Sequence, residues 1–394
     1  MNVPKLRFKE FTDEWKIIKL DELYEFKNGI NADKTAYGKG VPLISVTDII
    51  NNNFITYNKI RGKIDISNNI LMNNSVEYGD ILFQRSSETF AEIGTSNIYL
   101  DNKIATFGGF VIRGKRKNNE IPLFINYELK SPDSRKKIII KGAGAQHYNI
   151  GQEDLRQVSI FVPSKAEQTK IANFLSLLDK KIELQTKKIE DLKLYKLSLL
   201  NHLLKKYDTK KIILKDICKI YAGGTPSTSN EKYWNGNIKW IQSGLIQNCL
   251  IKHDDIKNTI TELGLNSSST KMIKPNTTLL AMTGATCGNT AFLECEACAN
   301  QSVMAFETTK VNSKFIYYLF QNNKKYILKF QAGGAQSGIN KSSCERLEFD
   351  FPNIELQNKI VKILDYCEEQ LSNNILKLSK LQELKKGFMQ KMFI

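Results

Sequence analysis

One passage occurs twice in the chain. Residues 161–185 read FVPSKAEQTKIANFLSLLDKKIELQ, and residues 350–374 read DFPNIELQNKIVKILDYCEEQLSNN. The offset is that between Pro163 and Pro352, and no gap is needed from Ile150 to the end of the chain. Gln168 then matches Gln357. A repeat of this length predicts a molecule built from two copies of one structural unit.

Apolar residues in both passages recur at alternating steps of four and three, which is the period of a left-handed coiled coil. The seam residues are Ile171, Leu175, Leu178, Ile182, Gln185, Ile189 and Leu192 in the first copy, and Ile360, Leu364, Leu371, Asn374, Leu378 and Leu381 in the second. We expect two long helices that pair antiparallel, with Gln185 near Asn374 as a polar layer that selects one register. The alternative is two amphipathic helices, each packed only on its own domain.

The segments between these helices repeat more loosely. Residues 15–29 resemble 210–224, residues 41–50 resemble 238–247, and residues 78–88 resemble 275–285. All are short apolar runs separated by Asn, Gly and Asp, which predicts strands and turns. We therefore expect an α+β fold with a pseudo-twofold internal repeat. The expected order is a globular domain (1–162), a long helix (163–206), a second globular domain (207–351) and a final long helix (352–394).

The composition narrows the class of partner. The 394 residues include 57 Lys and Arg against 41 Asp and Glu, a formal charge of +16, which favours a polyanion such as nucleic acid or an anionic membrane surface. No apolar run approaches the roughly 20 residues of a membrane span, and the N-terminus does not resemble a signal peptide. Seven scattered cysteines suit a reducing compartment, so we expect a cytoplasmic protein.

Short motifs in this order resemble one known family. They are Leu6-Arg7-Phe8 near the start, Gly223-Gly224-Thr225-Pro226-Ser227 with Tyr233-Trp234, Asn300-Gln301-Ser302, Ala335-Gln336-Ser337, and the Pro-x-x-x-x-Gln-x-x-Ile pattern at Pro163 and Pro352. The chain resembles the DNA-sequence specificity subunit of type I restriction–modification systems over essentially its whole length. The first domain departs from the pattern, because Lys27-Asn28-Gly29-Ile30 stands where the second has the Gly-Gly-Thr-Pro block.

The resemblance implies a division of labour between subunits. Each target-recognition domain would bind one half of a split, non-palindromic site in double-stranded DNA. The paired helices would set the spacing and dock two methyltransferase (modification) subunits, and two restriction subunits could join. The chain itself would need no cofactor, since S-adenosylmethionine, ATP and Mg²⁺ would belong to those partners. A stand-alone DNA-binding regulator with two binding domains, or a scaffold that binds only proteins, are the alternatives.

Candidate DNA contacts in the first domain are polar or basic side chains that follow apolar runs. Arg pairs with guanine and Gln with adenine in the major groove, while Lys and Arg also bind phosphates. The candidates are Gln84, Arg85, Ser86, Lys103, Arg113, Lys115, Arg116 and Gln146. For Arg85 the alternative is an ion pair with Glu88 or Glu92, and for the basic cluster it is a solvated turn.

Candidates in the second domain follow the same reasoning. A Gly-Gly-Thr turn with exposed amides would suit close approach to phosphate, and polar residues after strands could bind bases. The candidates are Gly223, Gly224, Thr225, Ser227, Gln242, Ser243, Thr283, Gly284, Gln336 and Ser337. The alternatives are a purely structural turn for the glycines and a hinge for the last pair.

The sequence offers little for catalysis. Neither Asn-Pro-Pro nor Asp-Pro-Pro occurs, which argues against a methyltransferase, and Phe107-Gly108-Gly109-Phe110 is a poor cofactor loop. Asp254, Asp255 and Lys257 are a weak match to a metal-dependent nuclease. Cys295 and Cys298 form a single Cys-x-x-Cys pair, so buried thiols are favoured over zinc. We expect no enzyme activity and no metal.

Overall fold

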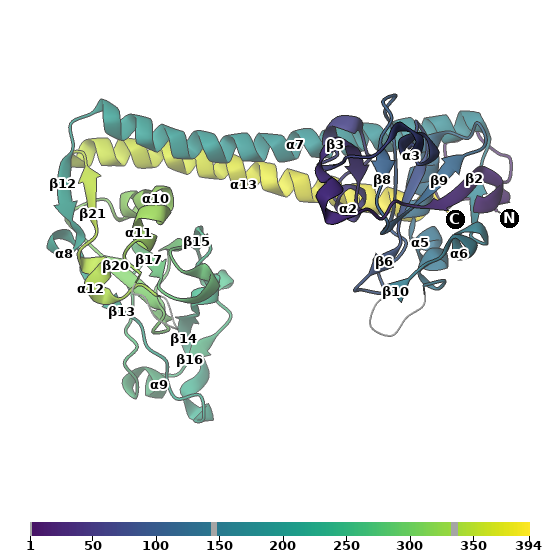
Figure 1. Ribbon diagram of the computed structural model, residues 1–394. Coiled ribbons are helices and arrows are strands. Elements are labelled where there is room, and N and C mark those ends of the chain that lie inside the picture. Colours follow the sequence, from purple (N-terminus) through teal and green to yellow (C-terminus); the bar gives the residue numbers. More distant parts are fainter. Residues whose placement is uncertain (1, 143–147, 332–337) are drawn as a thin grey trace. The chain divides into compact units, whose positions relative to one another are not determined.

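The computed structural model describes residues 2–142, 148–331 and 338–394. Its contacts divide the chain into two units, one of Met1–Thr186 with Leu376–Ile394 and one of Lys187–Ile375. Each unit contains one globular domain and one half of each of two long helices, α7 (Lys165–Lys206) and α13 (Ile354–Lys391), which are labelled in Figure 1. The predicted α+β class and the two long helices are therefore confirmed.

The domain of the first unit is built on two sheets. The larger has the order β2-β9-β5-β7 and is antiparallel throughout, and the smaller has the order β4-β3-β8. Two short ladders, β1 with β11 and β6 with β10, complete the pairing. The strands are β1 Lys16–Lys19, β2 Tyr24–Asn28, β3 Tyr37–Ile44, β4 Gly62–Ile64, β5 Ile81–Gln84, β6 Ser86–Ser87, β7 Ser96–Ile98, β8 Thr106–Phe107, β9 Val111–Arg116, β10 Tyr148–Asn149 and β11 Ser159–Val162. The helices are α1 Leu20–Leu23, α2 Val46–Ile50, α3 Asn68–Asn73, α4 Pro122–Lys130, α5 Pro132–Ile139 and α6 Gln152–Arg156.

The second unit repeats this plan, with one more strand in its larger sheet. Its larger sheet has the order β13-β20-β17-β18-β15, its smaller sheet β16-β14-β19, and β12 pairs with β21. The strands are β12 Lys210–Ile213, β13 Lys219–Ala222, β14 Trp234–Ile241, β15 Cys249–Ile251, β16 Thr259–Ile260, β17 Thr277–Ala281, β18 Thr290–Leu293, β19 Cys298–Ala299, β20 Val303–Glu307 and β21 Glu348–Phe351. The helices are α8 Leu214–Ile217, α9 Glu262–Asn266, α10 Ser313–Asn322, α11 Lys324–Leu328 and α12 Lys341–Glu345.

The strand registers prove the internal repeat and correct one alignment. The β3–β4 ladder has an irregularity between Tyr37 and Val41, and the β14–β16 ladder has the same irregularity between Trp234 and Ile238. In β1 and β12, however, the partner of Lys16 is Val162 and that of Lys210 is Phe351. Residues 15–29 therefore correspond to 209–223, one residue earlier than the sequence comparison placed them, because apolar residues alternate closely enough there to fit either register.

A proline and a capping residue start both long helices in the same way. The backbone N–H of Glu167 donates to Ser164 Oγ at 3.5 Å, and that of Leu356 donates to Asn353 Oδ1 at 2.9 Å. Such side-chain caps satisfy N–H groups that the first turn leaves without partners. Pro163 and Pro352 come directly before these caps and end the preceding strand segment.

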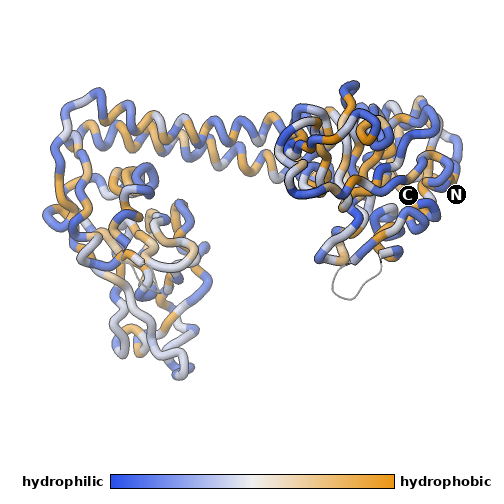
Figure 2. Tube along the Cα trace, in the orientation of Figure 1, coloured by the Kyte–Doolittle hydropathy of each residue, from blue (hydrophilic) through white to orange (hydrophobic). Residues whose placement is uncertain are grey.

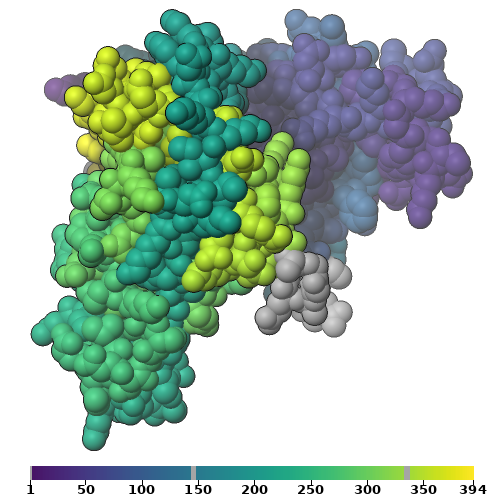
Figure 3. Space-filling model, turned by 90° about the vertical axis from the view of Figure 1, so that its left-hand side faces the viewer, coloured from purple at the N-terminus to yellow at the C-terminus, as the bar shows by residue number. Residues whose placement is uncertain are grey.

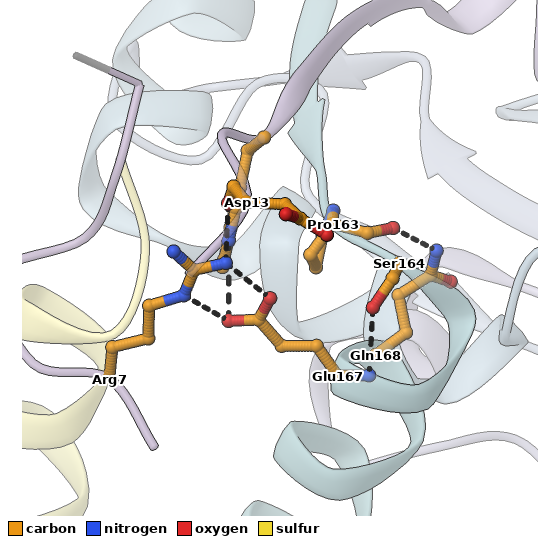
Figure 4. Close-up of polar contacts among 7 residues, drawn as sticks. Arg7, Asp13, Pro163, Ser164, Glu167 and Gln168 are labelled. Carbon is orange, nitrogen blue, oxygen red and sulfur yellow. Dashed lines mark hydrogen bonds and ion pairs between the residues drawn. The ribbon is translucent and has the colours of Figure 1, made fainter. Parts of the chain in front are cut away.

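The glutamine of the repeated motif ties each long helix to its domain. Gln168 Nε2 donates to the Pro163 carbonyl at 2.9 Å (Figure 4), and Gln168 Oε1 accepts from the Ile121 N–H at the start of α4. Gln357 does the same with the Pro352 carbonyl at 2.8 Å and with the Asn312 N–H at the start of α10. Both glutamines are buried. The motif is therefore a structural joint between the long helix and the domain helix.

The two long helices pack against each other antiparallel within each unit. In the first unit Phe174, early in α7, meets Phe388, late in α13, with ring centroids 4.8 Å apart. In the second unit Lys196, late in α7, forms an ion pair with Glu368, early in α13. Figure 3 shows the second-unit halves of α7 and α13 lying against each other as teal and yellow-green surfaces. The predicted antiparallel pairing is confirmed.

Every predicted seam residue is buried or half-buried, and the helices also pack on the domains. Ile171 and Leu175 belong to the core of the first domain, and Ile360 and Leu364 to that of the second. Along both helices Figure 2 shows apolar and polar positions alternating, as the 3.5-residue period requires. Gln185 and Asn374 are both buried, and their mutual contact stays a prediction.

The polar seam positions at Lys196 and Lys385 have acidic partners on the opposite helix. Lys385 Nζ lies 2.5 Å from Asp179 Oδ1, and Asp179 Oδ2 also accepts from the Tyr127 hydroxyl at 2.7 Å. Lys196, paired with Glu368, also donates to Gln321 Oε1 at 2.8 Å. Because each lysine bridges the two helices inside one unit, these positions help to define the register of the pairing.

Candidate nucleic-acid interface

Strand ends gather at one edge of the second domain. Strands β13, β14, β17 and β19 end there and β20 begins there. Backbone hydrogen bonds join the loops: the Gly224 N–H donates to the Ala299 carbonyl at 2.8 Å, and the Met282 N–H donates to the Ser302 carbonyl at 2.9 Å. We call residues 223–230, 242–248, 282–288 and 300–302 the second loop edge. Loops held by a rigid sheet are the usual place for binding residues.

Four predicted residues of the second domain lie together on this edge. Gln242, Thr283 and Gly284 are exposed, and Ser243 is half-buried. The Thr286 hydroxyl donates to the Ser243 carbonyl at 3.2 Å, which holds the loops after β14 and β17 side by side. Gly284 has φ +71, a conformation that favours glycine. The strand ends thus bring these predicted residues into one polar surface.

The Gly-Gly turn is part of the core of the second domain. Gly223 and Gly224 are buried, and both of their N–H groups donate to backbone carbonyls of Val303 and Ala299. A Cβ on Gly223 would clash with the carbonyl oxygen of Ala299, so glycine is required for close backbone packing. The prediction of exposed amides for phosphate was therefore wrong, and the structural alternative holds.

The residues that follow the Gly-Gly turn stay accessible. Thr225 Oγ1 donates to Gln301 Oε1, and the exposed Ser227 hydroxyl lies 2.8 Å from that of Ser229. Trp234 Nε1 donates to the Ser227 carbonyl at 3.1 Å, and this hydrogen bond holds the turn in place. Thr225 and Ser227 therefore remain candidates at the second loop edge.

The first domain has an equivalent edge. The Gly29 N–H donates to the Val111 carbonyl, as the Gly223 N–H donates to the Val303 carbonyl. We call this shared arrangement of strand ends and backbone hydrogen bonds the backbone frame. We call residues 29–31, 45–47, 85–87 and 108–110 the first loop edge. Here the Arg85 N–H donates to the Phe110 carbonyl at 2.9 Å. The frame is shared, but the side chains at its tip differ between the domains.

Arg85 and Ser86 lie on the first loop edge, whereas Gln84 points inward. Arg85 is half-buried and its Nη1 lies 3.5 Å from the Gly109 carbonyl; no ion pair joins it to Glu88 or Glu92, all three being described residues. The Ser86 hydroxyl donates to Asn149 Oδ1 at 2.5 Å. Gln84 is buried and its Nε2 donates to the Ser86 carbonyl at 2.9 Å. Burial removes Gln84 from the interface that we propose.

The predicted basic cluster does not form one surface with Arg85. Val111 begins β9 at the first loop edge, and Arg116 ends it about 17 Å away at ~3.4 Å per residue. Lys115, paired with Glu77 at 3.8 Å, and Arg116, bonded to the Glu120 carbonyl at 2.9 Å, therefore lie at the opposite end of the strand. Exposed Lys103 stands apart, with its ammonium 5.1 Å from the Tyr57 ring centroid.

Arg113 is a core residue of the first domain. It is buried, its Nη1 donates to the Ser75 carbonyl, and its guanidinium lies 5.5 Å from the Phe107 ring centroid. A buried cation is retained only when hydrogen bonds and aromatic contacts compensate for lost water. These contacts explain the position and take Arg113 away from any DNA surface.

Three further predicted contacts lie outside the described residues. They are Gln146 in residues 143–147 and Gln336 and Ser337 in residues 332–337. Both segments directly precede residues bound to a loop edge, since the Ile150 N–H donates to the Arg85 carbonyl and the Ile339 N–H to the Met282 carbonyl. These three residues stay predictions.

Sequence reasoning missed a partly buried ion pair at the start of α7. Arg7 Nε and Nη2 donate to the two carboxylate oxygens of Glu167, each at 2.8 Å, and Nη2 also donates to the Asp13 carbonyl (Figure 4). The hydrogen bond to Glu167 is the main cause that raises the pKa of Arg7. Trp15 Nε1 donates to the same carboxylate at 3.3 Å. The N-terminal segment is thereby fixed to the long helix.

Within the described residues, no three His, Cys, Asp or Glu side chains group in a way that could hold a metal ion. The Cys298 thiol contacts Met272 Sδ at 3.2 Å, and burial raises the pKa of Cys298 to about 11, which keeps it protonated. No helix among the described residues combines the length and apolar character needed to cross a membrane.

Comparisons with known proteins match this two-domain frame. The family model "Type I restriction modification DNA specificity domain" matches twice, at residues 12–194 and 206–386. The chain is 30% identical over 173 residues to the type I restriction enzyme MjaIX specificity subunit of Methanocaldococcus jannaschii, covering 43% of this chain and 39% of that protein. It is 30% identical over 169 residues to the EcoR124I/EcoR124II specificity subunit of Escherichia coli, covering 41% of each.

Other matches extend over the full length. The putative MjaX specificity subunit of M. jannaschii is 22% identical over 98% of this chain and 95% of its own. A crystal structure of the type I restriction–modification S subunit from M. genitalium matches with TM-score 0.61 and 18% identity, covering 100% and 99% of the two chains. A structure from work on assembly of the type I R-M system matches with TM-score 0.59 and 13% identity, covering 95% and 96%.

The fold therefore defines a protein of two homologous α+β domains carried on paired long helices. The chain belongs to the type I restriction–modification DNA specificity family, whose domain it contains twice. The alignments with the first two relatives span only about two fifths of those proteins.

Proposed function

We propose that this chain is the sequence-reading subunit of a type I restriction–modification complex in the cytoplasm. Each loop edge binds one half of a bipartite, non-palindromic site in double-stranded DNA. The observation that carries this proposal is that equivalent backbone hydrogen bonds in the two domains join different residues. The bond joins Arg85 to Phe110 in the first domain and Met282 to Ser302 in the second. Unlike side chains on a common frame favour unlike half-sites, whereas two identical tips would favour a palindrome.

The paired helices are proposed to set the spacing between the half-sites. Helix α7 is continuous over 42 residues, a length of about 60 Å at ~1.5 Å per residue. DNA rises about 34 Å per turn, so such a helix is commensurate with a gap that leaves central base pairs uncontacted. The formal charge of +16 supports binding of the chain to DNA phosphates.

The helices also carry exposed apolar side chains at matched positions, which we propose as contacts for two modification subunits. Leu177 and Tyr366 occupy the same position in the two copies, and so do Tyr195 and Leu384; all four are exposed. Leu177 and Leu384 belong to the first unit, Tyr195 and Tyr366 to the second. The pairs recur because the two helices are copies of one repeat, and each unit would offer its own pair to one modification subunit. Methyl transfer, ATP and Mg²⁺ are assigned to the partners, and the chain itself to recognition without catalysis.

Methylome sequencing of the host with and without this gene tests the proposal. Loss of one split, non-palindromic methylated motif is expected, and it would yield both half-sites and the gap. A test variant replaces Tyr195 and Leu384, one from each unit, by Glu, which should abolish methylation at that motif while the purified chain still binds its DNA. Loss of no motif, together with salt-independent DNA affinity of the purified chain, would refute the proposal. Phosphate contacts require affinity to fall with salt at a log–log slope of about −0.9 per phosphate.

A further inference from the structure

The most exposed large apolar side chain among the described residues lies on the first loop edge. Phe110 is 69% exposed and occupies a tight turn in which the Val111 N–H donates to the Gly108 carbonyl at 2.9 Å. The Phe110 carbonyl is held by the Arg85 N–H. A Cβ on Gly109 would meet the Asn31 side chain, so glycine lets Asn31 pack against this turn. The fold thus holds an apolar ring outward at the point where the polar loops meet.

A pocket of about 330 Å³ opens beside Phe110. Its apolar walls include Tyr37, Leu43 and Val46, and Ser86 lies at its margin. Tyr37 is itself exposed. The pocket is lined by the first loop edge, by its neighbouring strand β3 and by Val111 at the start of β9. An apolar hollow among polar loops is suited to a small apolar group carried by an otherwise polar ligand.

The Arg85 guanidinium determines which base edge would fit next to the pocket. Arg85 Nη1 lies 3.5 Å from the carbonyl of Gly109, the residue before Phe110, so the guanidinium lies against the turn that carries Phe110. In the major groove a guanidinium pairs with guanine O6 and N7, and the thymine 5-methyl group is the one apolar feature among the base edges. A donor fork beside an apolar pocket therefore complements a guanine next to a thymine.

We propose that Phe110 and the pocket beside it contact the 5-methyl group of a thymine in the first half-site. This assignment rests on the proposed function of the chain. Phe110 is then a specificity-determining residue of the first domain, and Arg85 acts at the adjoining base pair.

The second domain cannot make this contact. Val111 and Val303 hold the same place in the frame, so Ser302 occupies the position of Phe110 and Met282 that of Arg85. Met282 is buried. The second half-site therefore provides an internal control within the same molecule.

Deoxyuridine provides the test because it differs from thymidine only by the missing methyl group. The complex of the full chain with its modification subunits is titrated with duplexes that carry the methylome-defined site. Thymines of the first half-site are replaced by deoxyuridine one at a time, and those of the second half-site in a parallel series. One first-half substitution is expected to weaken binding by roughly fourfold, the scale of burying one methyl group.

Phe110→Ser, which copies the second domain, and Phe110→Ala should bind thymine and deoxyuridine duplexes equally well. Both variants should keep the wild-type melting temperature, which shows that they are folded, and their response to second-half substitutions should be unchanged. The assignment is overturned if no first-half substitution weakens wild-type binding, if the half-site contains no thymine, or if Phe110→Ala keeps the full deoxyuridine effect. Equal loss by Phe110→Ala on all duplexes would indicate a wedge between base steps instead. Failure to bind the split site at all would refute the proposed function itself.

Discussion

Asp179 joins the two long helices of the first unit, and its removal should be costly. Asp179 is 5% exposed and accepts from Lys385 Nζ at 2.5 Å and from the Tyr127 hydroxyl at 2.7 Å. Asp179→Ala leaves both donors without this acceptor. Breaking a buried ion pair costs roughly 3–5 kcal/mol, and the partly exposed Lys385 places this pair at the low end. An orphaned hydroxyl adds about 1 kcal/mol, so the expected loss is about 4 kcal/mol.

A loss of that size lowers the melting temperature of a unit of this length by roughly 8–16 °C. Hydrogen exchange read by mass spectrometry is the assay, because it follows residues 165–186 and 376–391 separately from the second unit. Glu183→Ala, an exposed change one turn further along α7, is the matched control and should cost under about 0.5 kcal/mol.

A second substitution separates the charge from the packing. Lys385→Met in the Asp179→Ala background removes the unpaired ammonium and should recover more than half of the loss, since replacing a whole buried pair by apolar groups is often neutral. The reasoning is refuted if Asp179→Ala exchanges as slowly as the wild type, or if Lys385→Met makes the single variant worse.

Three further changes have defined outcomes. Burial raises the pKa of the Glu128 carboxyl from 4.5 to about 7, so the folded state binds this proton more tightly than the unfolded state does. The stability that this proton contributes is fully present below about pH 4.5, and roughly 3 kcal/mol of it is lost as the pH rises through 7. Glu128→Gln should therefore unfold at a higher urea concentration than the wild type at pH 8. Gln168→Ala removes two buried hydrogen bonds at the start of α7 and should lower the unfolding free energy by about 2–3 kcal/mol, with an unchanged value contradicting the joint. Gly223→Ala should lower the melting temperature because its Cβ would meet the Ala299 carbonyl. Gly244→Ala, which has open space around it, should melt at the same temperature as the wild type.

The two glycine substitutions also illustrate how far sequence reasoning reached in the candidate site. Gln242, Ser243, Thr283 and Gly284 were predicted from their place after strands, and the structure puts them on one edge. Strand ends can be predicted because apolar runs and turn residues are local signals. Whether a residue after a strand faces outward is a long-range matter, and the Gly-Gly turn was therefore misjudged.

The predictions that Arg113 and Gln84 contact DNA were wrong for a related reason. Arg113 lies two residues into β9 and Gln84 ends β5, and in both cases the face of the strand decides whether the side chain meets water or core. The buried partners that compensate them, the Ser75 carbonyl for Arg113 and the Ser86 carbonyl for Gln84, come from outside their own strands. Composition alone gives no information about such partners.

The amino-acid sequence by itself determined the duplication, the two long helices and their seam, because a 3.5-residue period and a gap-free repeat are properties of neighbouring residues. It also determined the order of the elements and the excess positive charge. Only the tertiary structure decided the one-residue register of β1 and β12, the acidic partners of Lys196 and Lys385, and the meeting of Arg85 with Phe110. These features depend on contacts between residues far apart in the chain, and such contacts are set by how strands pair and helices pack.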